Sequence, residues 1–312
     1  MKITIAGGTG FVGKALTDQL LKNNHEVIIL SRQTKDTSPA DGIRYVPWLN
    51  DSSSSIQELE GTDIFINLAG ESINSGRWTT QRKEKILNSR LASVQALLDI
   101  MNKLDRKPQA LINASAIGVY GTSEEKTFIE KDNHGFGNDF LSQTVSQWEN
   151  EANKAAQLGI RTVLCRFGII LDKQQGALPK IAFPYQSFIG GPIGNGHQWM
   201  SWIHIEDVIH AISFIIENEQ IQGPINFTAP NPVTMSEFGK ILAQVLHRPH
   251  WLPVPSFALK LLLGEMSTLV VEGQKVLPEM LLENGYQFMY PDLKMALKNI
   301  FSKKKYHSFL KR

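Results

Sequence analysis

The sequence predicts an α/β protein built on a doubly wound parallel sheet, with a smaller, mostly helical lobe at its C-terminal end. Two observations in the first half predict the sheet: short, nearly continuous apolar runs alternate with stretches of helical spacing, and a glycine-rich turn follows the first run. Such runs are typical of parallel strands that helices cover on both faces. A third observation predicts the lobe, because beyond residue 234 the pattern is mostly helical and is broken by prolines.

The first three strands are short apolar runs with clear ends. Residues 2–6 stop abruptly in glycines, and residues 14–22 continue with helical spacing until two asparagines. The run EVIILSR at 26–32 is the second expected strand, and IRYV at 43–46 is a short third strand. The order strand, helix, strand predicts a βαβ unit at the start of the chain.

The alternation continues through the middle of the chain. We expect a strand at 63–69, a long helix at 80–102 and a strand at 109–115. A second long helix at 139–158 precedes IRTVLCRFGIIL at 160–171, which is a further expected strand. Because these runs are apolar along almost their whole length, helices should cover both faces of the sheet.

The regular alternation then fails. Residues 176–202 are rich in glycine, proline and aromatic residues, which predicts an irregular segment that helps to form a pocket. A strand end and a helix are expected at 203–217, and a further strand at 224–229. We therefore divide the chain into a sheet domain at residues 1–230 and a C-terminal lobe at residues 231–312.

Composition and charge exclude several classes of protein. Of the 312 residues, 42% are hydrophobic and 20% are charged, and the formal net charge is +2. This balance gives neither nucleic acid nor a membrane surface an electrostatic reason to bind. The single cysteine, Cys165, lies in an apolar run, where core packing is expected. One cysteine and no visible secretory signal predict a cytoplasmic location, and no Cys/His cluster has the spacing of metal ligands.

The glycine-rich turn has the spacing of a dinucleotide-binding loop. In GGTGFVG, at residues 7–13, glycine recurs at every third position, between a strand and a helix. Gly7 permits a tight turn, Gly10 lets a phosphate approach the backbone, and Gly13 lets the helix pack closely on the sheet. Amide groups at the start of the helix would then face a pyrophosphate, as in an NAD(P)-binding Rossmann fold. The predicted contacts with the cofactor are Gly7, Thr9, Gly10, Phe11, Val12 and Gly13.

The end of the second strand favours NADP(H) over NAD(H). An NAD-binding unit usually places Asp or Glu at this point, where it holds the ribose 2′-hydroxyl. This chain has Ser31 and Arg32 instead. An acidic residue would repel a 2′-phosphate, whereas a guanidinium pairs with it in a forked geometry. We therefore expect Ser31 and Arg32 to contact the adenosine ribose and its phosphate.

Several stretches resemble the extended short-chain dehydrogenase/reductase family of NAD(P)-dependent epimerases, dehydratases and reductases. They are GGTGFVG, NLAGE at 67–71, NASAIGVYG at 113–121, RFGIIL at 166–171 and WIHIEDVIHAI at 202–212. A narrower resemblance is to a branch called "epimerase family protein", which has its own C-terminal domain (DUF1731-like). It rests on NLAGESINSGRWTTQRKEKILNSR, GGPIGNGHQWMSWIHIEDV and LGEMSTLVVEGQKVLPEMLLENGYQF.

The resemblance implies roles for residues at matching positions. It implies that Ser115 polarises a substrate oxygen, and that His204 and Asp207 belong to a largely structural motif. The further cofactor contacts that it implies are Leu68, Ala69, Gly70, Phe167, Gly168 and Ile169, the last three near the nicotinamide. The narrow branch alone shares a group formed by Glu71, Arg77, Trp78 and Lys83.

The sequence departs from the family at its proton donor. Family chemistry uses a Tyr-x-x-x-Lys pair in the helix after the serine strand: the tyrosine exchanges the proton that accompanies hydride transfer, and the lysine lowers the pKa of the phenol. No tyrosine occurs between residues 121 and 184. The pairs that align with the family position are Phe140/Thr144, Leu141/Val145 and Gln143/Gln147. The usual proton donor is therefore missing.

Two residues are candidates to replace it. Tyr120 follows Ser115 closely and is either a proton donor or an aromatic residue packed near a turn. Glu71 follows a strand end and is either a carboxyl group whose pKa a closed pocket raises, or a capping or surface carboxylate. Lys83 and Arg82 form either a solvated helix face or a site for an anionic substrate. Ser115 alone can polarise a carbonyl but cannot easily supply a proton.

Two functions remain open at this point. The first is an NADP(H)-dependent oxidoreductase or epimerase with an atypical proton donor, acting on a nucleotide-sugar-like or other carbonyl substrate. The second is an NADPH-binding sensor or scaffold with little or no catalysis, which the missing Tyr/Lys pair favours. Either way the expected partner is a small molecule, with no nucleic acid, membrane or metal, and a homodimer is allowed.

Overall fold

The computed structural model of the protein describes residues 1–32, 42–49, 55–132 and 137–302. Seven parallel strands form its central sheet, as the apolar runs predict. In spatial order the strands are β3 (Ile43–Pro47), β2 (Glu26–Ser31), β1 (Lys2–Ala6), β4 (Ile64–Asn67), β5 (Ala110–Ala116), β7 (Arg161–Phe167) and β11 (Gly223–Phe227). The strand order reverses between β1 and β4, so their carboxyl ends frame the crevice where ligands bind to open α/β sheets.

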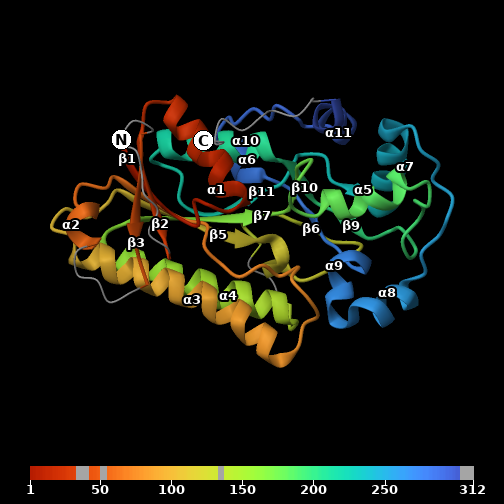
Figure 1. The fold of residues 1–312 in the computed structure, drawn as a ribbon, viewed down its shortest axis with the longest axis horizontal. Helices are drawn as coiled ribbons and strands as arrows, with labels where there is room; N and C mark the ends of the chain where they lie inside the picture. Colours follow the sequence, from red (N-terminus) through yellow and green to blue (C-terminus); the bar gives the residue numbers. More distant parts are fainter. Residues whose placement is uncertain (33–41, 50–54, 133–136, 303–312) are drawn as a thin grey trace.

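Helices cover both faces of the sheet, which confirms the doubly wound prediction (Figure 1). On one face lie α1 (Phe11–Lys22) and α6 (Ile205–Glu217), and on the other α3 (Thr80–Lys103) and α4 (Phe140–Ala152). Successive side chains of a strand point to opposite faces, so each strand supplies both cores. In β4, Ile64 and Ile66 join the core beneath α1 and α6, whereas Phe65 joins the core beneath α3 and α4.

The strand expected at 160–171 is interrupted at Gly168. It forms β7 in the central sheet and then β8 (Ile169–Leu171), which pairs with β10 (Trp202–His204) instead. The amide of Gly168 donates to the carbonyl of Phe227 at 3.1 Å, and a Cβ atom at this position would lie 2.5 Å from the carbonyl oxygen of Ser201. Only glycine fits so close to a neighbouring backbone, so the chain turns out of the sheet here.

Other boundaries differ from expectation in smaller ways. Helix α1 begins at Phe11, directly after the glycine loop, and not at residue 14. The helix expected at 139–158 ends as α4 and continues as a 3-10 helix, η3 (Asn153–Leu158). A short helix that the sequence did not predict, α2 (Ser55–Leu59), precedes β4.

The prediction that 176–202 is irregular throughout is wrong. The segment contains α5 (Leu178–Gln186), and β9 (Trp199–Met200) pairs with β12 (Val233–Thr234). Pro179 lies in the first turn of α5, where a helix needs no amide hydrogen, so this proline does not prevent the helix. The remaining residues of the segment connect these elements through glycine-rich turns.

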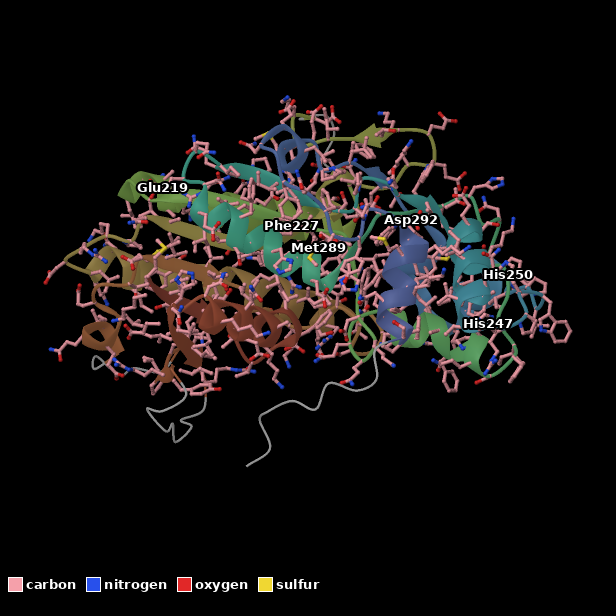
Figure 2. All side chains as sticks on the ribbon, turned by 90° about the horizontal axis from the view of Figure 1, so that it is seen from above. Glu219, Phe227, His247, His250, Met289 and Asp292 are labelled. Carbon is pink, nitrogen blue, oxygen red and sulfur yellow. The ribbon has the colours of Figure 1, made fainter. Side chains whose placement is uncertain are left out.

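Helices and short strands make up the C-terminal part, as expected. They are α7 (Met235–Leu246), α8 (Ser256–Leu263), η4 (Gly264–Ser267), α9 (Thr268–Val271), β13 (Lys275–Val276), α10 (Glu279–Glu283) and α11 (Leu293–Ser302). Figure 1 shows α5, α7, α8 and α9 beyond the end of the sheet toward which β5 and β7 point. In Figure 2, His247 and His250 accordingly lie at the end of the molecule opposite Glu219.

After α9 the chain returns to the sheet domain. Strand β13 pairs with β6 (Thr127–Phe128), and Leu281 and Tyr286 pack in the core beneath α1 and α6. The buried carboxylate of Asp207 accepts hydrogen bonds from the Tyr286 hydroxyl and from the amides of Met289 and Tyr290. The structural role that the resemblance implies for Asp207 is thus to anchor the returning chain to α6.

The described residues contain neither a membrane-spanning helix nor a metal-binding cluster. No helix there is long and apolar enough to cross a membrane. No group of three or more His, Cys, Asp or Glu side chains among them could hold a metal ion. Cys165 is buried in the core, as predicted, and burial raises the pKa of its thiol.

Candidate functional site

The glycine loop connects β1 to α1 with almost no room for side chains. Gly7 has a φ of +81°, and a Cβ atom there would lie 2.7 Å from the carbonyl carbon of Leu68. A Cβ atom on Gly13 would collide with the carbonyl oxygen of Gly7. These contacts let β1, β4 and α1 approach one another closely. The steric reasons predicted for the first and third glycines are therefore present.

Gly10 is different, because the protein itself leaves space beside it. A Cβ atom on Gly10 would approach only the carbonyl oxygen of Gly7, at 3.2 Å. Gly10 is also the N-cap of α1, with no side chain capping the helix and no acidic residue in the first turn. The first amide groups of a helix lack intrahelical partners and attract anions. Thr9 and Gly10 are exposed, and the amide of Gly10 donates to the carbonyl of Gly7 at 2.9 Å. The donors that the loop offers to an anion are therefore the backbone amides at the start of α1.

The predicted cofactor residues from β2 and β4 lie beside this loop. Leu68 and Ala69 follow β4 and contact Gly7, and the amide of Leu68 donates to the carbonyl of Ala6 at 2.8 Å. Ser31 ends β2, next to β1, and Arg32 follows it with an exposed side chain. The sheet therefore gathers residues of three strand ends at one edge.

Glu71 lies in a cluster of arginines at this edge, not in a closed pocket. Its carboxylate accepts a hydrogen bond from Arg82 at 2.9 Å, and its carbonyl accepts one from Arg90 at 3.0 Å. The hydrogen bond from Arg82 lowers the pKa of Glu71, helped by the charges of Lys85 and Arg32. The raised pKa expected of a proton donor is thus wrong in direction, because guanidinium groups stabilise the ionised form.

A cavity of about 480 Å³ opens at the same edge of the sheet, closer to the C-terminal helices. Phe167, Gly168 and Ile169, which the resemblance places near the nicotinamide, all line it. Trp78 and Phe140 form an aromatic pair on its wall, with ring centroids 5.3 Å apart. The C-terminal part closes the cavity with residues 265–274. The structure thereby brings segments that are far apart in the sequence, from Ile73 to Gln274, around one cavity.

Helix α4 presents apolar side chains to this cavity, where the family has its Tyr/Lys pair. Leu141 and Val145, one helical turn apart, line the wall together with Phe140. Of the three alignments considered, Leu141/Val145 is the one whose two members both face the cavity. The side chains that α4 contributes to the cavity wall are therefore hydrocarbon and cannot donate a proton.

Ser115 does not face the cavity, although the sequence predicts it to polarise a substrate oxygen. Its hydroxyl is buried and donates to Glu149 Oε1 at 2.5 Å. The neighbouring residue, Ala116, lines the cavity instead. Successive residues of a strand point in opposite directions, so a shift of one position moves a side chain from the site to the core.

Tyr120 is also bound within the protein and lies outside the cavity wall. Its buried hydroxyl donates to Asn226 Oδ1 at 2.8 Å and accepts a hydrogen bond from Arg166 at 2.8 Å. Burial raises the pKa of Tyr120 to about 12, against the lowering effect of Arg166. The phenol therefore keeps its proton at neutral pH and is poorly suited to act as a base.

Ser115 and Tyr120 belong to one buried network. Its centre is a two-pronged ion pair in which Arg166 donates to both carboxylate oxygens of Glu149, each at 2.8 Å. The side chains of Arg166 and Glu149 are 9% and 7% exposed. Ser115 and Tyr120 complete the hydrogen bonding of this pair, as buried charges require.

The polar groups that do line the cavity were mostly missed by sequence reasoning. Lys83 forms a close ion pair with Glu265 of η4, and the hydroxyl of Thr122 donates to Glu272 at 3.2 Å. Lys83 was noted, but its partner is far away in the sequence. Trp199 was noted among the aromatic residues of 176–202, and it also lines the cavity, whereas Trp202 is fully buried.

The fold and the glycine loop define a nucleotide-binding α/β protein of the Rossmann type. The model of the NAD dependent epimerase/dehydratase family matches residues 3–166, and a domain of unknown function, DUF1731, matches residues 254–300. The chain is 48% identical to the epimerase family protein YfhF of Bacillus subtilis over 98% of this chain and 99% of that protein. The chain belongs to the NAD dependent epimerase/dehydratase family, in the branch that the resemblance indicated.

Solved structures agree with this assignment. The human epimerase family protein SDR39U1 (isoform 2), solved with NADPH, has a TM-score of 0.86 and 32% identity, over 97% of this chain and 100% of that one. A nucleoside-diphosphate sugar epimerase from Corynebacterium glutamicum has a TM-score of 0.77 and 31% identity, over 96% of this chain and 58% of that one.

Replacing Tyr120 by Phe should reduce stability and leave any turnover in place. The change removes the Tyr120 hydroxyl from Nη1 of Arg166 and from Oδ1 of Asn226, which should lower the free energy of unfolding by about 1–3 kcal/mol. Urea unfolding measures this loss, and turnover is compared at a temperature where both proteins are folded. Unchanged stability with abolished turnover would instead identify Tyr120 as a catalytic residue.

Gly10→Ala and Gly13→Ala should affect different properties: the first NADPH affinity, and the second the stability of the fold. Gly13→Ala collides with backbone and should destabilise the protein by about 1–3 kcal/mol. Gly10→Ala should lower NADPH affinity at least about tenfold and cost only about 1 kcal/mol of stability at the N-cap. Calorimetric titration and thermal unfolding of both variants test this contrast. Equal NADPH affinity of Gly10→Ala and the parent would refute the role given to Gly10.

Proposed function

We propose that the protein is an NADP(H)-dependent oxidoreductase that acts on a small carbonyl compound. One observation carries the proposal: the glycine loop, Arg32 and the cavity lie along a single carboxyl edge of the sheet, and Phe167–Ile169 form part of the cavity wall. The residues expected to bind the cofactor and the residues expected to surround the substrate therefore follow strands whose carboxyl ends lie along the same edge of the sheet. Epimerisation through a transient carbonyl is a variant of the same chemistry.

The residues present fit a nicotinamide dinucleotide. The bare backbone at Gly10 and the uncapped start of α1 suit a pyrophosphate. Arg32 stands where an NAD-binding unit would carry a carboxylate, and Arg82 and Lys85 lie nearby, around Glu71. This positive charge supports NADP(H) over NAD(H), because a 2′-phosphate needs cationic partners. The NADPH in the structure of human SDR39U1 supports the same preference.

The bound cofactor would supply or accept a hydride. The residues of the chain would have to exclude water and transfer a proton. Apolar residues such as Phe167, Ile169 and Leu141 keep water from the reacting centre. A proton must reach or leave the substrate oxygen from a source other than Ser115 and Tyr120, which are committed to the buried network. The ionisable groups on the wall that can hold or move one are Lys83, Asp139, Glu265 and Glu272.

A second function is supported by the apolar wall itself. Ala116, Leu141 and Val145 line the cavity with apolar side chains, and Leu141/Val145 is one of the pairs that align with the family's tyrosine and lysine. A cavity without these groups is compatible with a protein that binds NADPH and turns it over slowly or not at all, as a sensor or scaffold does. The two functions share the cofactor and differ in turnover.

The cofactor preference is tested by Arg32→Ser. Loss of a charge-assisted hydrogen bond of about 1.5–3 kcal/mol should weaken NADPH binding by about 10- to 100-fold and leave NADH binding unchanged. Arg44→Ser is a matched control, since Arg44 is exposed on the neighbouring strand β3. Calorimetry with the pure protein gives both affinities. Failure of the parent protein to bind either dinucleotide would refute the proposed function.

Turnover is tested with NADPH, a panel of carbonyl compounds and a panel of nucleotide sugars. The proposed oxidoreductase should consume NADPH with at least one carbonyl compound, which the absorbance of the reduced nicotinamide reports. Epimerisation regenerates the cofactor and leaves this absorbance unchanged, so sugar products are separated and identified. Tight NADPH binding without any product would favour the sensor.

A further inference from the structure

The cavity wall carries far more negative than positive charge. Three carboxylates line it, those of Asp139, Glu265 and Glu272, against a single ammonium group, that of Lys83. Its formal balance at neutral pH is therefore one positive against three negative charges, or −2. No arginine is among the lining residues of the described chain.

The single cation is already neutralised. Lys83 forms a close ion pair with Glu265, and its ammonium group lies 5.4 Å from the centre of the Phe140 ring. Its side chain is 27% exposed and that of Glu265 is 64% exposed, so a second anion would meet a compensated ion pair instead of a free cation. The positive charge that an anionic substrate needs is thus not available on the cavity wall.

Nearby guanidinium groups are engaged elsewhere. Arg77 donates to the carbonyl oxygens of Leu261 and Leu262, at 3.2 and 2.8 Å, and so connects the loop after β4 to α8. Arg82 is bound to Glu71 at 2.9 Å. Neither arginine is among the residues that line the cavity.

The other two carboxylates, those of Asp139 and Glu272, accept hydrogen bonds from uncharged groups. Asp139 caps α4 by accepting from the amides of Leu141 and Ser142, at 2.8 and 3.0 Å. Glu272 is exposed, and the hydroxyl of Thr122 donates to it. Neither carboxylate is neutralised by an ion pair of its own in the described structure. An anion entering the cavity would therefore be repelled.

The rest of the wall is mostly hydrocarbon. The side chains that contribute it include Trp78, Ile117, Phe140, Leu141, Val145 and Leu269. Polar groups there, such as the hydroxyl of Ser201, already donate to backbone carbonyls of the protein. A ligand that fits this wall buries apolar surface and brings few hydrogen-bonding groups.

We infer that the substrate is an uncharged, largely apolar carbonyl compound, and that the cavity excludes nucleoside-diphosphate sugars. This inference rests on the proposed function and narrows it. A diphosphate carries at least two negative charges, and it would meet a wall that is itself negative and has its single lysine paired. The same wall rejects a simple carboxylate for the same reason.

Two probes that share the acetophenone skeleton and differ at the para position test the inference. para-Methylacetophenone is neutral, and para-acetylbenzoate differs from it in a single carboxylate. The full chain, with and without saturating NADP⁺, is titrated with each probe and with UDP-glucose in a calorimeter. The neutral probe should bind at least about tenfold more tightly than the carboxylate, and UDP-glucose should not bind. Failure of the neutral probe to bind, or equal or tighter binding of either anion, would overturn the inference.

A charge variant provides a second test at the same site. Glu265→Gln releases the ammonium group of Lys83 into the cavity, so it should raise the affinity for para-acetylbenzoate about tenfold and leave that for para-methylacetophenone unchanged. Glu219→Gln is the control, since Glu219 is exposed, does not line the cavity and lies at the end of the molecule opposite His247 and His250 (Figure 2). An unchanged carboxylate affinity in Glu265→Gln would show that wall charge does not govern selection.

Different measurements test the proposed cofactor function and the charge selectivity of the cavity. Titration with NADPH and NADP⁺ alone tests the proposed cofactor function. The probe comparison without cofactor tests the charge selectivity of the cavity. A protein that binds no dinucleotide but still prefers the neutral probe would refute the function and retain the selectivity of the cavity.

Discussion

The buried ion pair between Glu149 and Arg166 is the interaction on which the shape of the site depends. It joins α4 to β7, and through Ser115 and Tyr120 it also holds the end of β5 and the 3-10 helix η2 (Ile117–Tyr120). Burial would lower the pKa of Arg166, but Glu149 more than reverses this effect. An ion pair taken out of water needs such additional hydrogen bonds to offset its desolvation. Ser115 and Tyr120, which resemble catalytic residues, therefore serve to hold together the elements next to the cavity.

Much of the fold could be predicted from the sequence because local patterns determine it. Nearly continuous apolar runs that alternate with helical spacing predicted the parallel strands, and the glycine loop predicted the crevice beside β1. The split at Gly168 was hidden, since RFGIIL reads as one apolar run and the close approach of Ser201 comes from a distant segment. Helix α5 was hidden by its two prolines: Pro179 lies in the first turn, which tolerates it, but Pro184 lies inside the helix.

The chemistry of the site was harder to predict, for two physical reasons. A strand turns successive side chains in opposite directions, so an assignment that is off by one residue exchanges Ser115 for Ala116 and a polar group for a methyl. The second reason is distance along the chain. Lys83 meets Glu265 and Thr122 meets Glu272 only because the C-terminal part folds back over the sheet edge. No local pattern encodes such pairings.

The closure of the cavity by residues 265–274 places the two halves of the site far apart in the sequence. The loop that suits the dinucleotide lies at residues 7–13, while much of the cavity's C-terminal wall is formed by residues more than 250 positions later. Recombination between relatives could exchange this wall and leave the nucleotide cradle intact. Chimeras in which residues 265–274 come from a relative are accordingly expected to change substrate selectivity and to keep the dinucleotide loop.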